Sequence, residues 1–194
     1  KSKTGYYEFS ILIDRQNKTL KISDKAIGLD LGIKDFIVTS EGQKYENLKL
    51  RRHNEARLVR LHRQLSRKIK GSNNSNKSRI KLAKLYNKIN NQKEYYLHSI
   101  VNQILDENQI IGIENLNVIG MLKNHKLSKA IQEVSWSRFD NILKYKAKWY
   151  GREVIEIDRF FASSKLCNEC GYKNNELTLN DRFWTCPICG KYHD

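Results

Sequence analysis

Two kinds of apolar pattern divide the chain into short strands and longer helices. Short runs rich in β-branched and aromatic residues, bounded by turn residues, predict strands. These runs cover residues 6–13 and 19–22, as a hairpin, and then 26–32, 36–39, 44–46, 110–114 and 153–157. Apolar positions that recur every three or four residues predict helices. The helical pattern covers residues 50–70, 77–106 and 135–150, and the polar residues 120–131 are predicted to form a loop.

The order of these elements indicates the fold class. Three neighbouring strands are followed by two helices, a strand, a helix and a last strand. This order is typical of a ribonuclease H-like (RuvC-like) α/β domain with a mixed sheet, although other α/β layouts share parts of it. The two helices of residues 49–107 stand where the first crossover helix belongs, so we expect them to form a helical hairpin inserted in the domain.

The predicted hairpin has one apolar face and one basic face. Its apolar face, at helical spacing, consists of Leu58, Leu61, Leu65, Ile69, Leu82, Leu85, Ile89 and Tyr96. Residues 49–88 hold 14 Lys and Arg and a single acid, Glu55, so this stretch supplies +13 of the net charge of +15. Lys and Arg that neutralise phosphates release counterions, which makes nucleic acid the expected partner. A merely solvated helical face is the alternative.

The basic side chains that we expect to contact nucleic acid lie on both helices. They are Arg52, Arg57, Arg60, Arg63, Arg67, Lys68, Lys77, Arg79, Lys81 and Lys84, together with Arg182 near the C-terminus.

Composition excludes several classes of protein. Hydrophobic residues make up 39% and aromatic residues 10% of the 194 residues, which is too many for a disordered basic tail. No apolar run approaches the roughly 20 residues that span a bilayer, so we expect no membrane partner. Residues 1–6 contain no apolar stretch of a secretory signal, and we expect a cytoplasmic protein.

Two carboxylates interrupt predicted apolar strands. Asp30 lies within Ile27-Gly-Leu-Asp-Leu-Gly, and Glu114 ends Ile110-Ile-Gly-Ile-Glu. If the two strands are adjacent, both acids meet at one end of the sheet, where a divalent cation such as Mg²⁺ or Mn²⁺ would keep both ionised. Such a site suits phosphodiester hydrolysis. The alternatives are a turn-capping role for Asp30 and a helix-capping or surface role for Glu114.

Four cysteines lie close together near the C-terminus. Cys167 and Cys170 form one C-x2-C motif, and Cys186 and Cys189 form a second after fifteen intervening residues. This spacing predicts a four-thiolate structural zinc site, with Gly171 and Gly190 permitting the turn after each pair. Residues 177–179 and 182–185 are the expected arms of a zinc ribbon. A disulfide pair or a redox C-x-x-C motif is the alternative.

These motifs together resemble the OrfB/TnpB family of insertion-sequence-encoded proteins, relatives of the type V CRISPR effectors. The resemblance is carried by residues 28–34 (Gly-Leu-Asp-Leu-Gly-Ile-Lys), 112–116 (Gly-Ile-Glu-Asn-Leu), 163–171 and 177–190. It implies that Asp30 and Glu114 are catalytic residues of a RuvC-like nuclease, and that DNA and a guide RNA are partners. It also implies that residues 1–24 are the tail of a preceding β-barrel-like module, 25–160 the nuclease core and 161–194 the zinc ribbon.

The family continues after its ribbon with a third catalytic Asp, in an Asp-Arg-Asp-x-Asn-Ala-Ala stretch. Residues 193–194, His-Asp, align with the start of that stretch, so the third acid would follow the last residue and this polypeptide would be a poor nuclease alone. The sequence thus predicts the nuclease domain of a transposon-associated RNA-guided DNA endonuclease. A non-catalytic nucleic-acid-binding zinc-ribbon protein and a strand-transfer transposase are the alternatives.

Overall fold

The structure is a computed structural model that describes residues 2–14, 16–158, 161, 165–178, 181 and 183–193. The chain divides into two compact units, Lys1–Glu156 and Ile157–Asp194, which are described separately below. Among the described residues, none of the helices has the length and apolarity that crossing a lipid bilayer requires.

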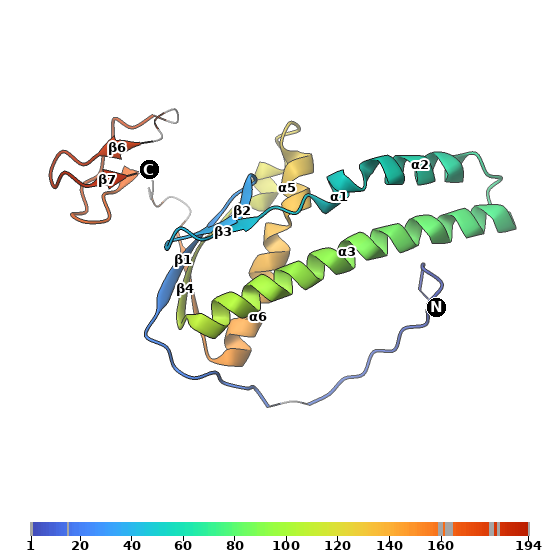
Figure 1. Ribbon diagram of the computed structural model, residues 1–194, viewed down its shortest axis with the longest axis horizontal. Helices are drawn as coiled ribbons and strands as arrows, with labels where there is room; N and C mark the ends of the chain where they lie inside the picture. The colour runs from blue at the N-terminus through green and yellow to red at the C-terminus, as the bar shows by residue number, and fades with distance from the viewer. Residues whose placement is uncertain are drawn as a thin grey trace. The chain divides into compact units, whose positions relative to one another are not determined.

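The first unit is built around a five-stranded mixed sheet with the strand order β3-β2-β1-β4-β5 (Figure 1). Strand β1 is antiparallel to β2, β2 is antiparallel to β3, and β1 is parallel to β4. The strands are β1 (Ala26–Leu31), β2 (Asp35–Thr39), β3 (Lys44–Glu46), β4 (Ile110–Glu114) and β5 (Glu153–Ile157). These five strands and the mixed α/β class confirm the predictions from the sequence.

The helices follow the predicted order with three differences, of which the first is that the helix predicted for residues 50–70 is divided at Asn54 into two. They are α1 (Leu50–His53), α2 (Glu55–Ser66), α3 (Asn73–Glu107), α4 (Val118–Met121), α5 (Ser128–Val134) and α6 (Trp136–Tyr150). Helix α3 begins four residues before the predicted position because the Ser72 hydroxyl caps it, accepting a hydrogen bond from the Ser75 N–H. The predicted loop at 120–131 is confirmed for residues 122–127, which form turns, but is wrong from Ser128 onward. Helix α5 begins there because Ile131 and Val134 are buried against the core.

Helices α3 and α6 cover one face of the sheet and enclose the main core (Figure 1). Alternate residues of β1 and β4, such as Leu29 and Ile113, point into this core. The aromatic ring of Phe36 meets that of Phe139 on α6 edge to face, with ring centroids 5.4 Å apart. The remaining residues of β1 and β4 therefore lie on the opposite face of the sheet.

The helical hairpin has a small core of its own, which confirms most of the predicted apolar face. Leu58 of α2 is buried against Leu82, Leu85 and Ile89 of α3, and Leu61 and Leu65 are partly buried beside them. Two predicted members do not belong to this cluster. Ile69 is 82% exposed because α2 ends at Ser66, and Tyr96 packs on the main core instead.

The predicted N-terminal hairpin is wrong. Residues 2–14 and 16–25 form no strand, and Phe9 and Leu12 are 93% and 99% exposed. An isolated two-stranded hairpin is marginal in water unless another strand or helix covers its apolar face, and in the first unit such cover is missing for these side chains. The assignment of residues 1–24 to a barrel-like module stays a prediction.

The second unit contains a short antiparallel pair, β6 (Trp184–Thr185) and β7 (Tyr192–His193). The arms expected at 177–179 and 182–185 lie partly outside the described residues. Within the described part, the partner of β6 is β7, and Leu166 forms an isolated bridge with Lys173.

Candidate metal centres and nucleic-acid interface

Asp30 and Glu114 occupy neighbouring positions on adjacent parallel strands. The register of β1 and β4 pairs Gly28 with Gly112 and Leu29 with Ile113. Asp30 and Glu114 follow directly, both still within their strands. Because neighbouring strands lie about 4.8 Å apart and paired positions share a face, the two acids are side by side on the same face of the sheet.

That shared face is the one that α3 and α6 leave uncovered. Asp30 is exposed and Glu114 is partly exposed, whereas the residue before each of them is buried. The apolar run around Asp30 therefore does not bury its carboxylate, because only one face of β1 is packed. Its carboxylate is open to solvent and to any ligand that approaches this face.

Two glycines precede the acids on this face. Gly28 and Gly112 pair with each other, two residues before Asp30 and Glu114. Glycine weakens a strand interior and often marks a place where another group approaches the backbone closely. A Cβ atom at Gly112 would meet its nearest neighbour at an ordinary 3.8 Å, so packing within the described structure does not require glycine there.

A group of charged side chains that the sequence did not predict lies next to Glu114. A cavity of about 140 Å³ is lined by Glu114, Asp140, Lys144 and Glu156, among others. The Lys144 ammonium donates a hydrogen bond to Asp140, at 2.8 Å, and also forms an ion pair with Glu156. Glu156 in turn accepts a hydrogen bond of 3.3 Å from the side-chain amide of Asn115. Asn115 follows Glu114 directly in the chain, so this hydrogen bond connects the charged group to the end of β4. The i, i+4 spacing of Asp140 and Lys144 was the only available sequence signal.

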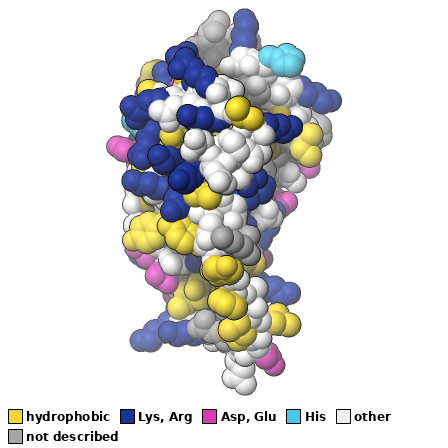
Figure 2. All heavy atoms as spheres, turned by 90° about the vertical axis from the view of Figure 1, so that its right-hand side faces the viewer, with side chains coloured by type: hydrophobic (Ala, Val, Ile, Leu, Met, Phe, Trp, Pro, Cys, Tyr) yellow, Lys and Arg dark blue, Asp and Glu magenta, His cyan; other side chains and the backbone are white. Residues whose placement is uncertain are grey.

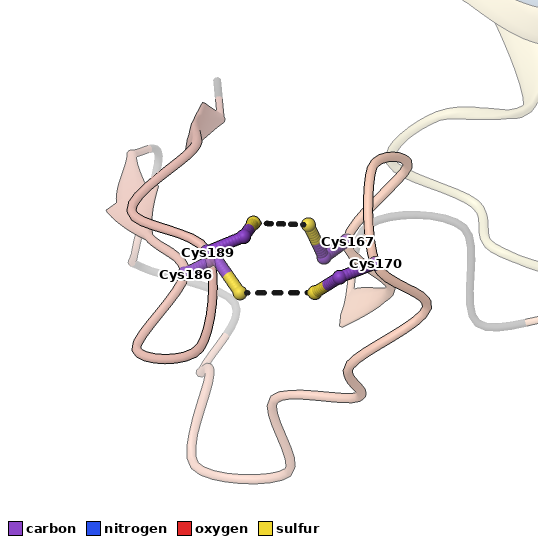
Figure 3. A group of neighbouring side chains, drawn as sticks. All are labelled: Cys167, Cys170, Cys186 and Cys189. Carbon is purple, nitrogen blue, oxygen red and sulfur yellow. Dashed lines mark hydrogen bonds between the residues drawn. The ribbon is translucent and has the colours of Figure 1, made fainter.

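The four cysteines converge as predicted (Figure 3). All four sulfur atoms lie within 4.8 Å of one another, and the Cys167–Cys189 and Cys170–Cys186 sulfur atoms are each 3.5 Å apart. Four sulfur atoms around a tetrahedral zinc ion, each about 2.3 Å from it, are separated by about 3.8 Å. The donor set and its spacing therefore fit one zinc ion, and all four cysteines are free of disulfide bonds.

Each cysteine pair sits in the same type of backbone turn. The Gly171 N–H donates to the Cys167 carbonyl and the Gly190 N–H to the Cys186 carbonyl, both at 2.9 Å. These glycines have φ angles of 74° and 72°, a left-handed conformation that favours glycine. The two C-x2-C motifs thus form matching turns, as the sequence indicated.

The electrostatics of the cluster also favour a cation. Burial acts to raise the pKa of the Cys167 thiol, but hydrogen bonds from backbone N–H groups in its turn and from other side chains, His193 among them, lower it to about 6. The hydrogen bond from the Tyr172 N–H acts to lower the pKa of Cys170, but burial and the contacts with the other three cysteines together outweigh it and raise this pKa to about 12. Once one thiolate forms, its neighbours keep their protons unless a cation compensates the charge.

The basic face of the hairpin is open to solvent (Figure 2). Residues 49–88 are all described, and within them no salt bridge engages any of the ten predicted contact residues. The single acid, Glu55, is paired with Lys129 of α5 at 2.6 Å, and this hydrogen bond lowers its pKa. The ten exposed side chains are Arg52, Arg57, Arg60, Arg63, Arg67, Lys68, Lys77, Arg79, Lys81 and Lys84. Arg182 lies outside the described residues.

Comparison with known protein families shows which family this chain belongs to. Residues 9–125 match the family OrfB_IS605, described as "Probable transposase", a match that covers more than half of the chain. The chain belongs to the OrfB_IS605 family. Residues 136–194, which include the four cysteines, match the "Cas12f1-like, TNB domain".

Curated relatives from bacteria support the family membership. A protein of Streptomyces pristinaespiralis named "Putative RNA-guided DNA endonuclease" is 40% identical over 194 residues, which is 100% of this chain and 48% of the relative. "Putative RNA-guided DNA endonuclease InsQ" of Escherichia coli K12 is 30% identical over 181 residues, covering 86% of this chain and 45% of the relative. The chain thus spans about half the length of these relatives.

Solved structures share the fold. A Cas12f1–sgRNA–target DNA complex aligns with a TM-score of 0.56 and 17% identity over 87% of this chain and 46% of that chain. A CRISPR–Cas12f ternary complex aligns with a TM-score of 0.58 and 20% identity, covering 95% of this chain and 39% of the other. At these identities the likeness concerns the fold.

Proposed function

We propose that this chain is the nuclease domain of a transposon-associated RNA-guided DNA endonuclease. The observation that carries the proposal is the placement of Asp30 and Glu114 side by side on an open sheet face. The names of the curated relatives support DNA as substrate and RNA as guide. The strand order β3-β2-β1-β4-β5, with β1 central and parallel to β4, supports a ribonuclease H-like core.

In this proposal Asp30 and Glu114 hold Mg²⁺ or Mn²⁺ through their carboxylate oxygens, the ligands that such hard cations prefer. The cation supplies polarisation of the scissile phosphate and activation of water. The protein contributes a fixed spacing of the two carboxylates, which the β1–β4 register sets. The paired Gly28 and Gly112 leave room for the nucleic acid backbone beside the acids.

The remaining predicted residues have supporting roles. The basic face of the hairpin neutralises phosphates of the guide–target duplex or of a displaced strand, recognising shape and charge rather than base sequence. The four cysteines hold a structural zinc, because a closed four-thiolate site leaves no coordination position open for catalysis. The zinc therefore stabilises the second unit and takes no part in hydrolysis.

The metal site is tested by Mn²⁺ titration of the 194-residue chain, followed through the relaxation of water protons. Both Asp30→Asn and Glu114→Gln should weaken Mn²⁺ binding at least tenfold, since each removes half of the paired charge. Glu41→Gln, in the β2–β3 turn, is the matched control and should bind as the wild type does. Identical isotherms for all four proteins would remove the metal site.

Nuclease activity is tested on the full-length parent protein, because the family resemblance expects a third catalytic Asp after residue 194. The protein is purified with the RNA that accompanies it and assayed with plasmid DNA and Mg²⁺. Asp30→Asn and Glu114→Gln should abolish cleavage, while Glu41→Gln should cleave as the wild type does. Cleavage by either active-site variant at the wild-type rate would contradict the assignment.

Strand transfer is the second candidate function, and the family description "Probable transposase" favours it. The same carboxylates would serve, but a DNA 3′-hydroxyl rather than water would attack the phosphate. The two reactions differ in their products. Hydrolysis leaves free ends, whereas transfer joins a labelled DNA end covalently to the target, and a denaturing gel separates the two.

A further inference from the structure

The second unit presents a stacked pair of aromatic rings to solvent. The rings of Phe183 and Tyr192 are nearly parallel, at 12°, with centroids 5.9 Å apart. Each side chain is nevertheless 61% exposed. The pair therefore keeps a large part of its aromatic surface open within the described part of this unit.

The β6–β7 register explains why this pair faces outward. Trp184 pairs with His193, and Thr185 pairs with Tyr192, so the two couples lie on opposite faces of the ribbon. The Trp184–His193 couple is stacked at 4.5 Å and partly buried. His193 Nε2 lies 3.3 Å from the Cys167 sulfur, so this couple lies on the face near the cysteine cluster. Tyr192 lies on the other face, where it stacks with Phe183.

The charge of this unit determines which part of a nucleic acid such a pair suits. Residues 157–194 contain five Lys and Arg and five Asp and Glu, so they carry no net charge, in contrast to the +13 of residues 49–88. A neutral surface gains little from neutralising phosphates. Open aromatic faces instead stack with nucleobases, whatever their sequence. Bases of a duplex are already stacked within it, so the fitting ligand is unpaired.

We infer that Phe183 and Tyr192 form a stacking platform for an unpaired base of single-stranded DNA. This inference rests on the proposed function in taking DNA as the partner. The chain then binds its substrate through two separable contributions. The hairpin attracts phosphates and weakens with salt, whereas the aromatic pair holds bases and persists at high salt.

The platform is tested by fluorescence anisotropy with the zinc-loaded 194-residue chain and a labelled 20-nucleotide oligothymidylate. An abasic oligomer of equal length and charge is the reference probe. At about 0.4 M salt, which suppresses the phosphate contribution, the wild type should bind the oligothymidylate more tightly than the abasic oligomer. Phe183→Ala and Tyr192→Ala should each weaken oligothymidylate binding roughly 5- to 100-fold, as expected for the loss of one stacked base, and leave abasic binding unchanged.

Three controls separate stacking from folding. Tyr192→Phe should retain binding, and Ile188→Ala removes an equally prominent apolar side chain, 69% exposed, without effect. The thiolate-to-cobalt absorption of Co²⁺-loaded protein should be unchanged in every variant, showing an intact cysteine site. Equal binding of both probes by the wild type, or undiminished oligothymidylate binding by both alanine variants, would overturn the platform. The oligothymidylate assay contains no Mg²⁺ or Mn²⁺, so its result does not depend on the metal site, and failure of the metal site and failure of the platform are distinguishable.

Discussion

Replacing three arginines of α2 and the arginine at its C-cap together by Gln should weaken duplex DNA binding mainly at low salt. Viewed down the helix axis, with 100° between successive residues, these side chains lie within an arc of about 120°. The centre of this arc is about 130° away from the direction of the buried leucines. They are exposed, and none is engaged in a salt bridge with the described acids. The four are Arg57, Arg60, Arg63 and Arg67.

The magnitude follows from counterion release. The association constant K falls with salt, and each lost phosphate contact makes the slope of log K against log salt concentration shallower by about 0.9. Four lost contacts therefore make it shallower by about 3.6. Between 50 and 200 mM salt, the wild type should therefore lose about 100-fold more affinity than the variant. Below 50 mM the wild type should bind far more tightly than the variant, and the two affinities should converge as salt rises.

The assay is anisotropy of a labelled 20-base-pair duplex over that range of salt. The matched control also loses four exposed positive charges, but away from the hairpin, through Gln at Lys18, Lys21, Lys25 and Lys148. Its slope should stay near that of the wild type. A fall of equal size in both variants would show that net charge alone drives binding. An unchanged slope in the α2 variant would refute the assignment of this face to nucleic acid.

Three further changes test packing, protonation and metal binding. Leu85→Ala should destabilise the hairpin core by about 2–5 kcal/mol and speed amide hydrogen exchange in α2 and α3. Ile69→Ala, at an 82% exposed position, is the control and should change neither the stability nor the exchange rates. The bidentate hydrogen bonds from Arg138 lower the pKa of Glu94, so their stabilisation is present above the ordinary pKa of the carboxyl and is lost as the pH falls through its lowered value. Urea midpoints of wild type and Glu94→Gln should therefore differ at pH 7 and converge at pH 3, and a constant difference would contradict this. Cys186→Ser should lower zinc affinity and loosen the second unit, which holds the cysteine cluster, so near-ultraviolet signals of its Trp184 should change while the far-ultraviolet helical signal persists. Loss of the helical signal would contradict this expectation.

The sequence was sufficient wherever a feature depends on neighbouring residues. The five strands of the sheet and the long helices follow from local periodicity, because backbone preference and one-sided burial act over a few residues. The two cysteine turns follow from their spacing and from Gly171 and Gly190, which adopt the left-handed conformation that the turn requires. The excess of basic residues in the hairpin is likewise a property of composition.

Local patterns failed where burial depends on distant partners. Residues 6–13 and 19–22 have strand-like sequences but form no hairpin, since most of their apolar side chains, Phe9 and Leu12 among them, stay exposed in the described structure. Asp30 lies in an apolar run, yet its side chain is exposed because only one face of β1 is packed. The run indicated a strand correctly but did not show how many of its faces are buried.

The candidate site depends on both levels. The sequence by itself supplied the chemistry, two carboxylates on apolar strands and four thiols at metal-binding spacing. Only the tertiary structure decided that Asp30 and Glu114, 84 positions apart, are neighbours, because the register of two parallel strands is fixed by packing on α3 and α6. It also decided which aromatic residues of the second unit face the cysteines and which face solvent, since pairing of β6 with β7 sets the two faces. The β1–β4 pairing joins residues far apart in the chain, and no local preference specifies it.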